Sequence, residues 1–240
     1  MCGRYTLTTG DRSAAGRRFG VEIGPDLDPT LGRFNVAPGQ EVLAIRCSDG
    51  ETRRPVGALW GLVPAWADDL KTGYRMINAR SETVLGSRAY GALVKKPSSR
   101  CLIPADGFFE WKGPAAKGGP KRPVRFTVGD GGLFSMAGLI TTREWEGGEL
   151  TSCTILTTEA DAAVAPVHDR MPVILADEGD EQAWLVEDLP AGRIAALTRP
   201  LDPERISSRL ASPLLNRVGA VPEGPDLLDP DWPGPGSLFG

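Results

Sequence analysis

The sequence has few of the residues that build metal centres and disulfide frameworks. It contains one histidine and four cysteines, and the cysteines stand far apart without any C-x-x-C pair, at positions 2, 47, 101 and 153. Zinc sites usually take their cysteine ligands from closely spaced pairs, so this pattern predicts neither a zinc site nor a dense set of disulfides. We therefore expect reduced thiols and neither a metal nor another cofactor.

Long apolar segments are also absent. No run approaches the roughly 20 residues that a membrane-spanning helix requires, and no charged segment followed by an apolar one marks a leader. We expect a cytoplasmic protein, monomeric and without membrane contact. A chain of 240 residues that is 41% hydrophobic can still bury a sizeable core.

Lysine is scarce, with six lysines against 21 arginines, and the net charge of −4 argues against a strongly basic nucleic-acid binder. The charge is unevenly distributed, because residues 1–130 sum to +7 and residues 131–240 to −11. The basic half is compatible with a phosphate-binding face, although charge along a chain also mixes in space on folding. Arginine favours bidentate phosphate contacts, but genome composition explains the same ratio.

Short apolar runs punctuated by glycine and proline favour β-structure over a helical bundle. The expected strands span residues 3–8, 42–47, 54–63, 101–111, 123–129, 133–141, 151–157 and 172–175. The expected helices span residues 11–19, 83–95, 159–165, 178–187 and 190–197. The pattern predicts one α+β domain over residues 1–222, with an exposed hairpin loop from Lys112 to Arg122 and a Pro/Gly-rich tail over residues 223–240.

Cys2 has a special position, because removal of Met1 would make it the N-terminal residue. Its α-amino group then has a pKa of about 7.7–8.0 and its thiol one of about 8.5, so both nucleophiles are usable near neutral pH. Such a 1,2-aminothiol condenses with an aldehyde to a stable thiazolidine ring. The small side chain at position 2 favours methionine removal. The alternative is that Cys2 is a small buried residue that starts the first strand.

Two titratable residues are candidates for proton transfer. Glu110 stands among large aromatic residues in the segment 101–111, where burial would raise its pKa, unless strand alternation turns it to solvent. His168 is followed by Asp169 and Arg170 just before a predicted buried strand, a place where functional residues are common. A single histidine is nevertheless more often structural.

The remaining candidates would bind a ligand. Asn78 and Arg80 follow an apolar strand, where the amide can orient a substrate and the guanidinium can bind a phosphate, although Asn78 could equally cap a helix. Trp66 and Tyr74 lie near proline and glycine and are suited to stacking on bases. Core packing is the ordinary alternative, and it is the better interpretation of Trp60.

The chain as a whole resembles the SOS-response-associated peptidase (SRAP) family. The resemblance rests on motifs that occur in order over roughly residues 2–220: MCGRY at 1–5, FNVAP at 34–38, WGLVP at 60–64, NARSET at 78–83, RCLIPADGFFEW at 100–111, AGL at 137–139 and HDRMP at 168–172. The segment 207–216 matches the family pattern only loosely, so no role is assigned to it.

The resemblance implies a curved, mainly antiparallel β-sheet or barrel core flanked by short helices, with Cys2 at the floor of a basic groove. It also implies binding of single-stranded DNA and crosslinking of Cys2 to abasic sites, with weak lyase and self-processing peptidase activity as further branches. The implied active-site set is Cys2, Asn78, Glu110 and His168, and the implied DNA contacts are Arg4, Arg80, Arg170, Trp66 and Tyr74.

Two other classes of function remain open on the residues. An N-terminal-nucleophile amidohydrolase also begins Met-Cys-Gly and would use the Cys2 amine as a base. A noncatalytic module that binds single strands would use the same arginines and tryptophans without covalent chemistry.

Overall fold

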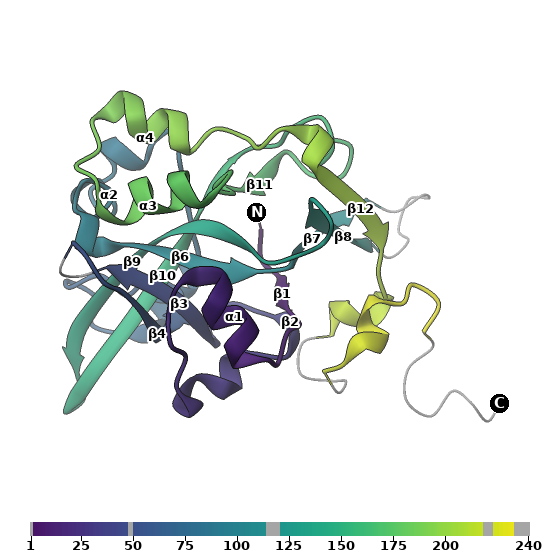
Figure 1. Cartoon of the computed structure of the whole chain (residues 1–240), viewed down its shortest axis with the longest axis horizontal. Helices are drawn as coiled ribbons and strands as arrows, with labels where there is room; N and C mark the ends of the chain where they lie inside the picture. The colour runs from purple at the N-terminus through teal and green to yellow at the C-terminus, as the bar shows by residue number, and fades with distance from the viewer. Residues whose placement is uncertain (1, 48–49, 114–120, 218–222, 233–240) are drawn as a thin grey trace.

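The computed structural model describes residues 2–47, 50–113, 121–217 and 223–232. The chain forms two mainly antiparallel sheets with short helices around them, which confirms the predicted α+β class (Figure 1). Three short strands were not expected, because their sequences show no long apolar alternation: β2 (Arg33–Val36), β5 (Asn78–Arg80) and β12 (Ile206–Leu210).

A closed barrel forms the centre of the larger sheet. Its members pair in the order β10-β4-β3-β6-β9, and β9 pairs again with β10 to close the ring. The five strands are β3 (Glu41–Cys47), β4 (Arg53–Trp60), β6 (Arg100–Ala105), β9 (Phe134–Trp145) and β10 (Gly148–Glu159). The β4–β10 contact is parallel, and the other four are antiparallel. β5 and β11 (Arg170–Pro172) also pair with β10.

The second sheet lies beside the barrel and has the order β12-β8-β7-β1-β2 (Figure 1). Its remaining strands are β1 (Tyr5–Leu7), β7 (Gly107–Lys112) and β8 (Arg122–Val128). β7 and β8 are antiparallel neighbours, as a hairpin requires, but residues 114–120 of the predicted hairpin loop lie outside the described residues.

The expected single strand over residues 101–111 is wrong, because it is two strands and the chain passes from one sheet to the other at Asp106. β6 ends in the barrel and β7 begins in the second sheet one residue later. Asp106 accepts hydrogen bonds from the hydroxyl groups of Thr6 and Thr8 and from Arg125. A Cβ at Gly107 would lie 2.5 Å from Arg125 Nε and 2.9 Å from Thr6 Oγ1, so a larger residue directly after this corner would displace side chains that bind Asp106.

Three of the expected helices form: α1 (Arg12–Phe19), α3 (Glu178–Val186) and α4 (Ala191–Leu197). The continuous helix expected over residues 83–95 is wrong, since glycines interrupt it and leave a 3₁₀ turn at Val84–Gly86 and α2 at Gly91–Lys95. The helix expected over residues 159–165 is also wrong. There Asp161 caps a local turn through Ala163 and Val164, and Pro166 cannot extend it.

Further 3₁₀ turns connect the strands. They are η1 (Pro25–Thr30), η2 (Leu70–Arg75), η4 (Pro97–Ser99), η5 (Pro203–Arg205), η6 (Pro213–Asn216) and η7 (Pro225–Leu228).

The described part of the predicted tail, residues 223–232, packs on the second sheet. Leu227 is buried in a small cluster with Phe109 and Leu215, and Glu223 forms an ion pair with Arg33 at 3.1 Å. The boundary near residue 222 stays a prediction. In the described part of the chain no helix has the length and apolarity to cross a membrane.

Candidate active site beside the N-terminus

Cys2 lies inside the molecule, directly before β1. Its side chain has no exposed surface, and its carbonyl oxygen accepts a hydrogen bond of 2.8 Å from Asn78 Nδ2. Asn78 opens β5, which is fixed at the barrel by parallel pairing with β10. The first residues of the chain are thus anchored to a strand that lies 76 positions away in the sequence.

Glu110 and His168 form the second part of the site. Glu110 lies on β7, where alternation turns it inward, and His168 follows the turn at residues 162–167. Their closest side-chain atoms, His168 Nε2 and Glu110 Oε2, are 3.9 Å apart. The structure therefore brings these two predicted residues together.

The surroundings of this pair determine its protonation. Burial raises the pKa of Glu110 to about 7, and the negative charge of Asp169 acts in the same direction. Burial lowers the pKa of His168, while Asp169 partly offsets this effect. His168 Nδ1 lies 2.9 Å from the Arg170 backbone N–H, which can donate to it, and 3.0 Å from Asp169 Oδ1. A neutral ring that accepts the Arg170 hydrogen bond has its proton on Nε2, the nitrogen nearest to Glu110.

The environment of the Cys2 thiol favours its protonated form. Burial raises its pKa well above the usual range, and the nearby charge of Glu110 raises it further. Its Sγ lies 3.8 Å from the Arg4 carbonyl oxygen, which a protonated thiol can approach as a weak donor.

Two buried acceptors in the site lack a donor. Glu110 Oε1 and Asn78 Oδ1 accept no hydrogen bond from any of the described residues. A buried polar atom without a partner costs free energy, so such atoms mark places where a ligand or a new donor can bind.

A pocket of about 420 Å³ opens onto the site. Its lining combines the predicted Arg4, Glu110 and His168 with four further residues: Gly3 before β1, Trp111 on β7, Lys121 before β8 and Asn216 on η6. Cys2 lies beneath this lining rather than in it, as its complete burial requires.

Arg4 is held in place from three sides. Its Nη1 donates to Asn35 Oδ1 at 2.7 Å and to the Leu215 carbonyl oxygen at 2.8 Å, and its guanidinium lies 5.6 Å from the ring centre of Trp111. Since Arg4 also lines the pocket, its remaining N–H groups are available to an anion there. Its predicted phosphate contact stays a prediction.

Arg170, for which a phosphate contact was predicted, already forms several hydrogen bonds within the protein. It is buried, and it donates to both carboxylate oxygens of Glu82 at 2.7 and 3.0 Å and to the Thr157 carbonyl oxygen at 2.6 Å. Partial burial acts to raise the pKa of Glu82, but the bonds with Arg170 outweigh it and lower that pKa. A phosphate would have to replace Glu82, so this role of Arg170 also stays a prediction.

The other predicted contacts lie on the surface. Arg80 is exposed and, two positions after Asn78 on β5, points to the same side of that strand. The side chains of Trp66 and Tyr74 are 66% and 60% exposed, which is unusual for residues of their size. Trp60, in contrast, is fully buried and donates to the Ile77 carbonyl oxygen at 2.9 Å, as the core interpretation predicted.

Several site residues escaped the sequence analysis. Asn35 belongs to the FNVAP motif without having been given a role, and Asn216 ends the segment to which none was assigned. Asn216 Oδ1 accepts a hydrogen bond of 2.6 Å from Trp111 Nε1, which fixes this wall of the pocket. Local patterns could not reveal these contacts, because they join positions more than 30 residues apart.

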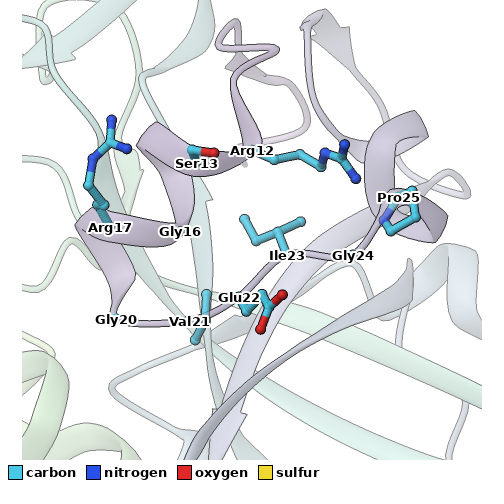
Figure 2. A pocket seen from close by; sticks show the side chains of 10 residues that line it. All are labelled: Arg12, Ser13, Gly16, Arg17, Gly20, Val21, Glu22, Ile23, Gly24 and Pro25. Atoms are coloured by element: carbon cyan, nitrogen blue, oxygen red, sulfur yellow. The ribbon is translucent and has the colours of Figure 1, made fainter.

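Another hollow, of about 690 Å³, lies between α1 and the segment that follows it (Figure 2). Figure 2 shows Ile23 facing the helix, while Arg12 and Arg17 extend in opposite directions from it. Arg12 forms an ion pair with Asp28 at 3.2 Å. No acid–base pair comparable to Glu110 and His168 lines this hollow, and no group of three metal-ligating side chains occurs among the residues described.

The fold and the site together define a barrel protein whose buried second residue adjoins a carboxyl–imidazole pair. A family model described as SOS response associated peptidase (SRAP) matches residues 1–218. The abasic site processing protein YoqW of Bacillus subtilis is 38% identical over 222 residues, covering 90% of this chain and 94% of YoqW. The abasic site processing protein YedK of Escherichia coli is 34% identical over 202 residues, covering 82% of this chain and 86% of YedK.

The fold is shared with a crystal structure of a protein from Bacteroides thetaiotaomicron. The two match with a TM-score of 0.80 and 24% identity over 95% of this chain and 99% of the other. The chain belongs to the SOS response associated peptidase family, as the sequence motifs predicted.

Proposed function

We propose that this protein processes abasic sites in single-stranded DNA by forming a covalent bond between Cys2 and the ring-opened aldehyde of the lesion. The observation that supports this most directly is the arrangement around Cys2. Asn78 holds its backbone, and the pair of Glu110 and His168 is close by. The names of the relatives YoqW and YedK point to the same lesion.

The reaction requires prior removal of Met1, which lies outside the described residues. The free Cys2 amine would supply the donors that the buried Glu110 Oε1 and Asn78 Oδ1 lack. Those contacts would hold the amine close to the group that must manage its protons.

The chemistry proceeds in one condensation step and one addition step. The Cys2 amine attacks C1′ of the aldehyde, and protonated Glu110 gives the departing hydroxyl a proton, so that an imine forms and one water leaves. The Cys2 thiol then adds to the imine carbon, while its proton passes to the imine nitrogen, directly or through Glu110 and His168. The product is a thiazolidine, and no oxidant, metal or other cofactor is consumed.

The resulting ring shields the lesion from strand scission. β-Elimination needs the free aldehyde or an imine, and the ring contains neither. Weak lyase activity follows as a branch whenever the imine eliminates before the thiol closes the ring. Self-removal of Met1 would be the simplest peptidase activity of the same nucleophile.

Noncovalent binding of the strand would use the exposed groups around the site. Arg80 and Arg4 offer guanidinium groups for phosphates, and Trp66 and Tyr74 offer rings for bases, each stack contributing about 1–3 kcal/mol. Stacking is tolerant of sequence, so binding is expected to depend little on the bases present.

The direct test is incubation with an oligonucleotide that contains one abasic site, followed by denaturing electrophoresis and intact-mass analysis. We expect a heat-stable adduct whose mass equals Met1-free protein plus DNA minus one water. A tetrahydrofuran abasic analogue, which has no aldehyde, is the matched control and should bind without an adduct. Absence of any adduct would leave only a noncatalytic binding module, and release of ammonia from glutamine would favour an amidohydrolase.

A further inference from the structure

We propose that the outer end of the β7–β8 pair forms a second phosphate-binding surface, which holds the DNA segment on one side of the abasic nucleotide. The surface consists of Lys112 and Arg122 and is called the hairpin cation pair below. The inference rests on the proposed function and adds a binding subsite to it.

The register of β7 and β8 places this cation pair next to the active site. Glu110 is opposite Val124, and Lys112 is opposite Arg122. Lys112 is two positions beyond Glu110, so its side chain points to the same face of the sheet. A DNA strand that reaches Glu110 would therefore meet the hairpin cation pair next, on the same face of the sheet.

A second hollow lies near the pocket that Glu110 lines. This hollow, of about 600 Å³, is lined by Lys112, Arg122 and Val124 and, across it, by Pro166 and Val167. Residues next in sequence to three of these, namely Trp111, Lys121 and His168, line the active-site pocket. The two hollows thus share the end of the β7–β8 ladder and the turn before His168.

The charges of the surface point to an anionic occupant. The side chains of Lys112 and Arg122 are exposed, and neither side chain forms a hydrogen bond or an ion pair with any described residue, although the two backbones pair in the β7–β8 ladder. No carboxylate lines the hollow, and Arg209 of the edge strand β12 adds a third cation. Like charges directly opposite each other destabilise an antiparallel pair, so this arrangement costs stability unless an anion binds between them.

The exposed Trp66 and Tyr74 belong to the connection between β4 and β5, two strands of the barrel sheet. Trp66 precedes β5, which belongs to the barrel sheet with Asn78, whereas the hairpin cation pair belongs to the second sheet with Glu110. We expect a DNA strand that crosses the site between Asn78 and Glu110 to have one flank toward the barrel sheet and the other near Lys112. The bound chemistry is a phosphodiester backbone, read without regard to base.

The test compares oligonucleotides with a tetrahydrofuran abasic analogue near the 5′ end, near the 3′ end or at the centre. Fluorescence anisotropy gives the gain in affinity that each added flank provides. Lys112→Glu combined with Arg122→Glu should remove most of the gain from one flank and keep it for the other. Lys95→Glu combined with Lys96→Glu makes the same charge change at α2, on the opposite side of the molecule (Figure 1), and is the matched control.

A milder pair, Lys112→Gln with Arg122→Gln, guards against misfolding and should act on the same flank. Losing two phosphate contacts to a single strand should reduce the slope of log affinity against log salt by about 1.4. Equal losses on both flanks, an equal loss in the α2 control or no loss at all would overturn the inference. Failure of wild-type protein to form an adduct with an aldehyde-bearing site would instead overturn the proposed function, whatever the flanks show.

Discussion

The imidazole of His168 faces the carboxyl of Glu110 across 3.9 Å, between Nε2 and Oε2. The His168 ring reaches this place because the Arg170 backbone N–H fixes Nδ1, and Glu110 reaches it from the buried face of β7. The burial that raises the pKa of Glu110 to about 7 also lowers the pKa of His168, so near neutral pH about half of the Glu110 carboxyls are protonated and the neutral form of His168 is favoured. A neutral acid next to a neutral base is suited to passing a proton in either direction.

Glu110→Gln should slow adduct formation by about 100-fold or less, the usual extent of general acid–base catalysis. Glutamine preserves size and polarity but cannot exchange a proton. The endpoint should approach that of wild type, because an N-terminal aminothiol condenses with aldehydes unaided. Single-turnover gel kinetics provide the measurement. An unchanged rate in both Glu110→Gln and His168→Ala would assign the pair a structural role.

The pH dependence of the same reaction should reveal the Glu110 acid. Because its pKa is about 7, the wild-type dehydration rate should decrease as pH rises through 7. Glu110→Gln should lack this decrease. A rate that depends identically on pH in both proteins would show that another group donates the proton.

The raised pKa also has a consequence for stability, with a definite sign. Between the usual value of 4.5 and about 7 the folded state binds more protons at Glu110 than the unfolded state does. The Glu110 contribution to the free energy of unfolding is therefore greatest at low pH and decreases across this window. Urea unfolding at several pH values should show a steeper decrease for wild type than for Glu110→Gln, and parallel curves would contradict the assignment.

Cys2→Ser separates the two nucleophiles. The variant keeps the amine and replaces the thiol by a poor nucleophile, so the heat-stable adduct should disappear, while an imine becomes trappable with borohydride. Affinity for the tetrahydrofuran analogue should remain close to that of wild type. Wild-type amounts of stable adduct from this variant would exclude a thiazolidine.

Arg143 should control the Trp66 contact from a distance. Its Nη1 donates to the carbonyl oxygens of Pro64 at 2.6 Å and Ala67 at 2.8 Å, which begin and end the turn that presents Trp66. We expect Arg143→Ala to weaken binding and to reduce quenching of a fluorescent base near the lesion, with Arg143→Lys intermediate. In a double-mutant cycle the Arg143→Ala effect should shrink when Trp66 is already alanine. If the effects of Arg143→Ala and of the Trp66 substitution simply add, Arg143 does not act through Trp66.

The contact between α1 and α3 predicts a loss of stability. Glu181 is fully buried and forms ion pairs with Arg18 at 2.7 Å and Arg53 at 3.5 Å. Glu181→Ala should reduce the free energy of unfolding by about 2–4 kcal/mol, because it leaves the guanidinium groups of Arg18 and Arg53 without their carboxylate. Urea denaturation measures the change, and Glu178→Ala, at an exposed position of the same helix, should have a much smaller effect.

Some elements of this structure can be predicted from short segments of the sequence. Asp11 and Gly20 cap α1, and residues 41–47 form the expected strand, because capping chemistry and apolar runs act over a few residues. The change of sheet at Asp106 could not be found this way. It depends on hydrogen bonds from Thr6 and Arg125, which approach from distant parts of the chain.

The candidate site shows the same division. Cys2, Asn78, Glu110 and His168 could be proposed from residue type and motif, and the structure places Asn78 against Cys2 and Glu110 near His168. No local sequence pattern indicated the ion pair of Arg170 with Glu82, because 88 positions separate the two residues. A motif states which side chains are present, but only the packed fold decides which of their donors are already occupied.

The corner at Asp106 has a mechanical meaning. Asn78 is attached to the barrel and Glu110 to the second sheet, so a hinge between the sheets would widen or narrow the space above Cys2. The hydrogen bonds of Asp106 with Thr8 and Arg125 hold the corner between β6 and β7 against the second sheet. If Cys2, Asn78 and Glu110 act as proposed, a substitution of Asp106 would leave each of these side chains intact and would change how they are aligned.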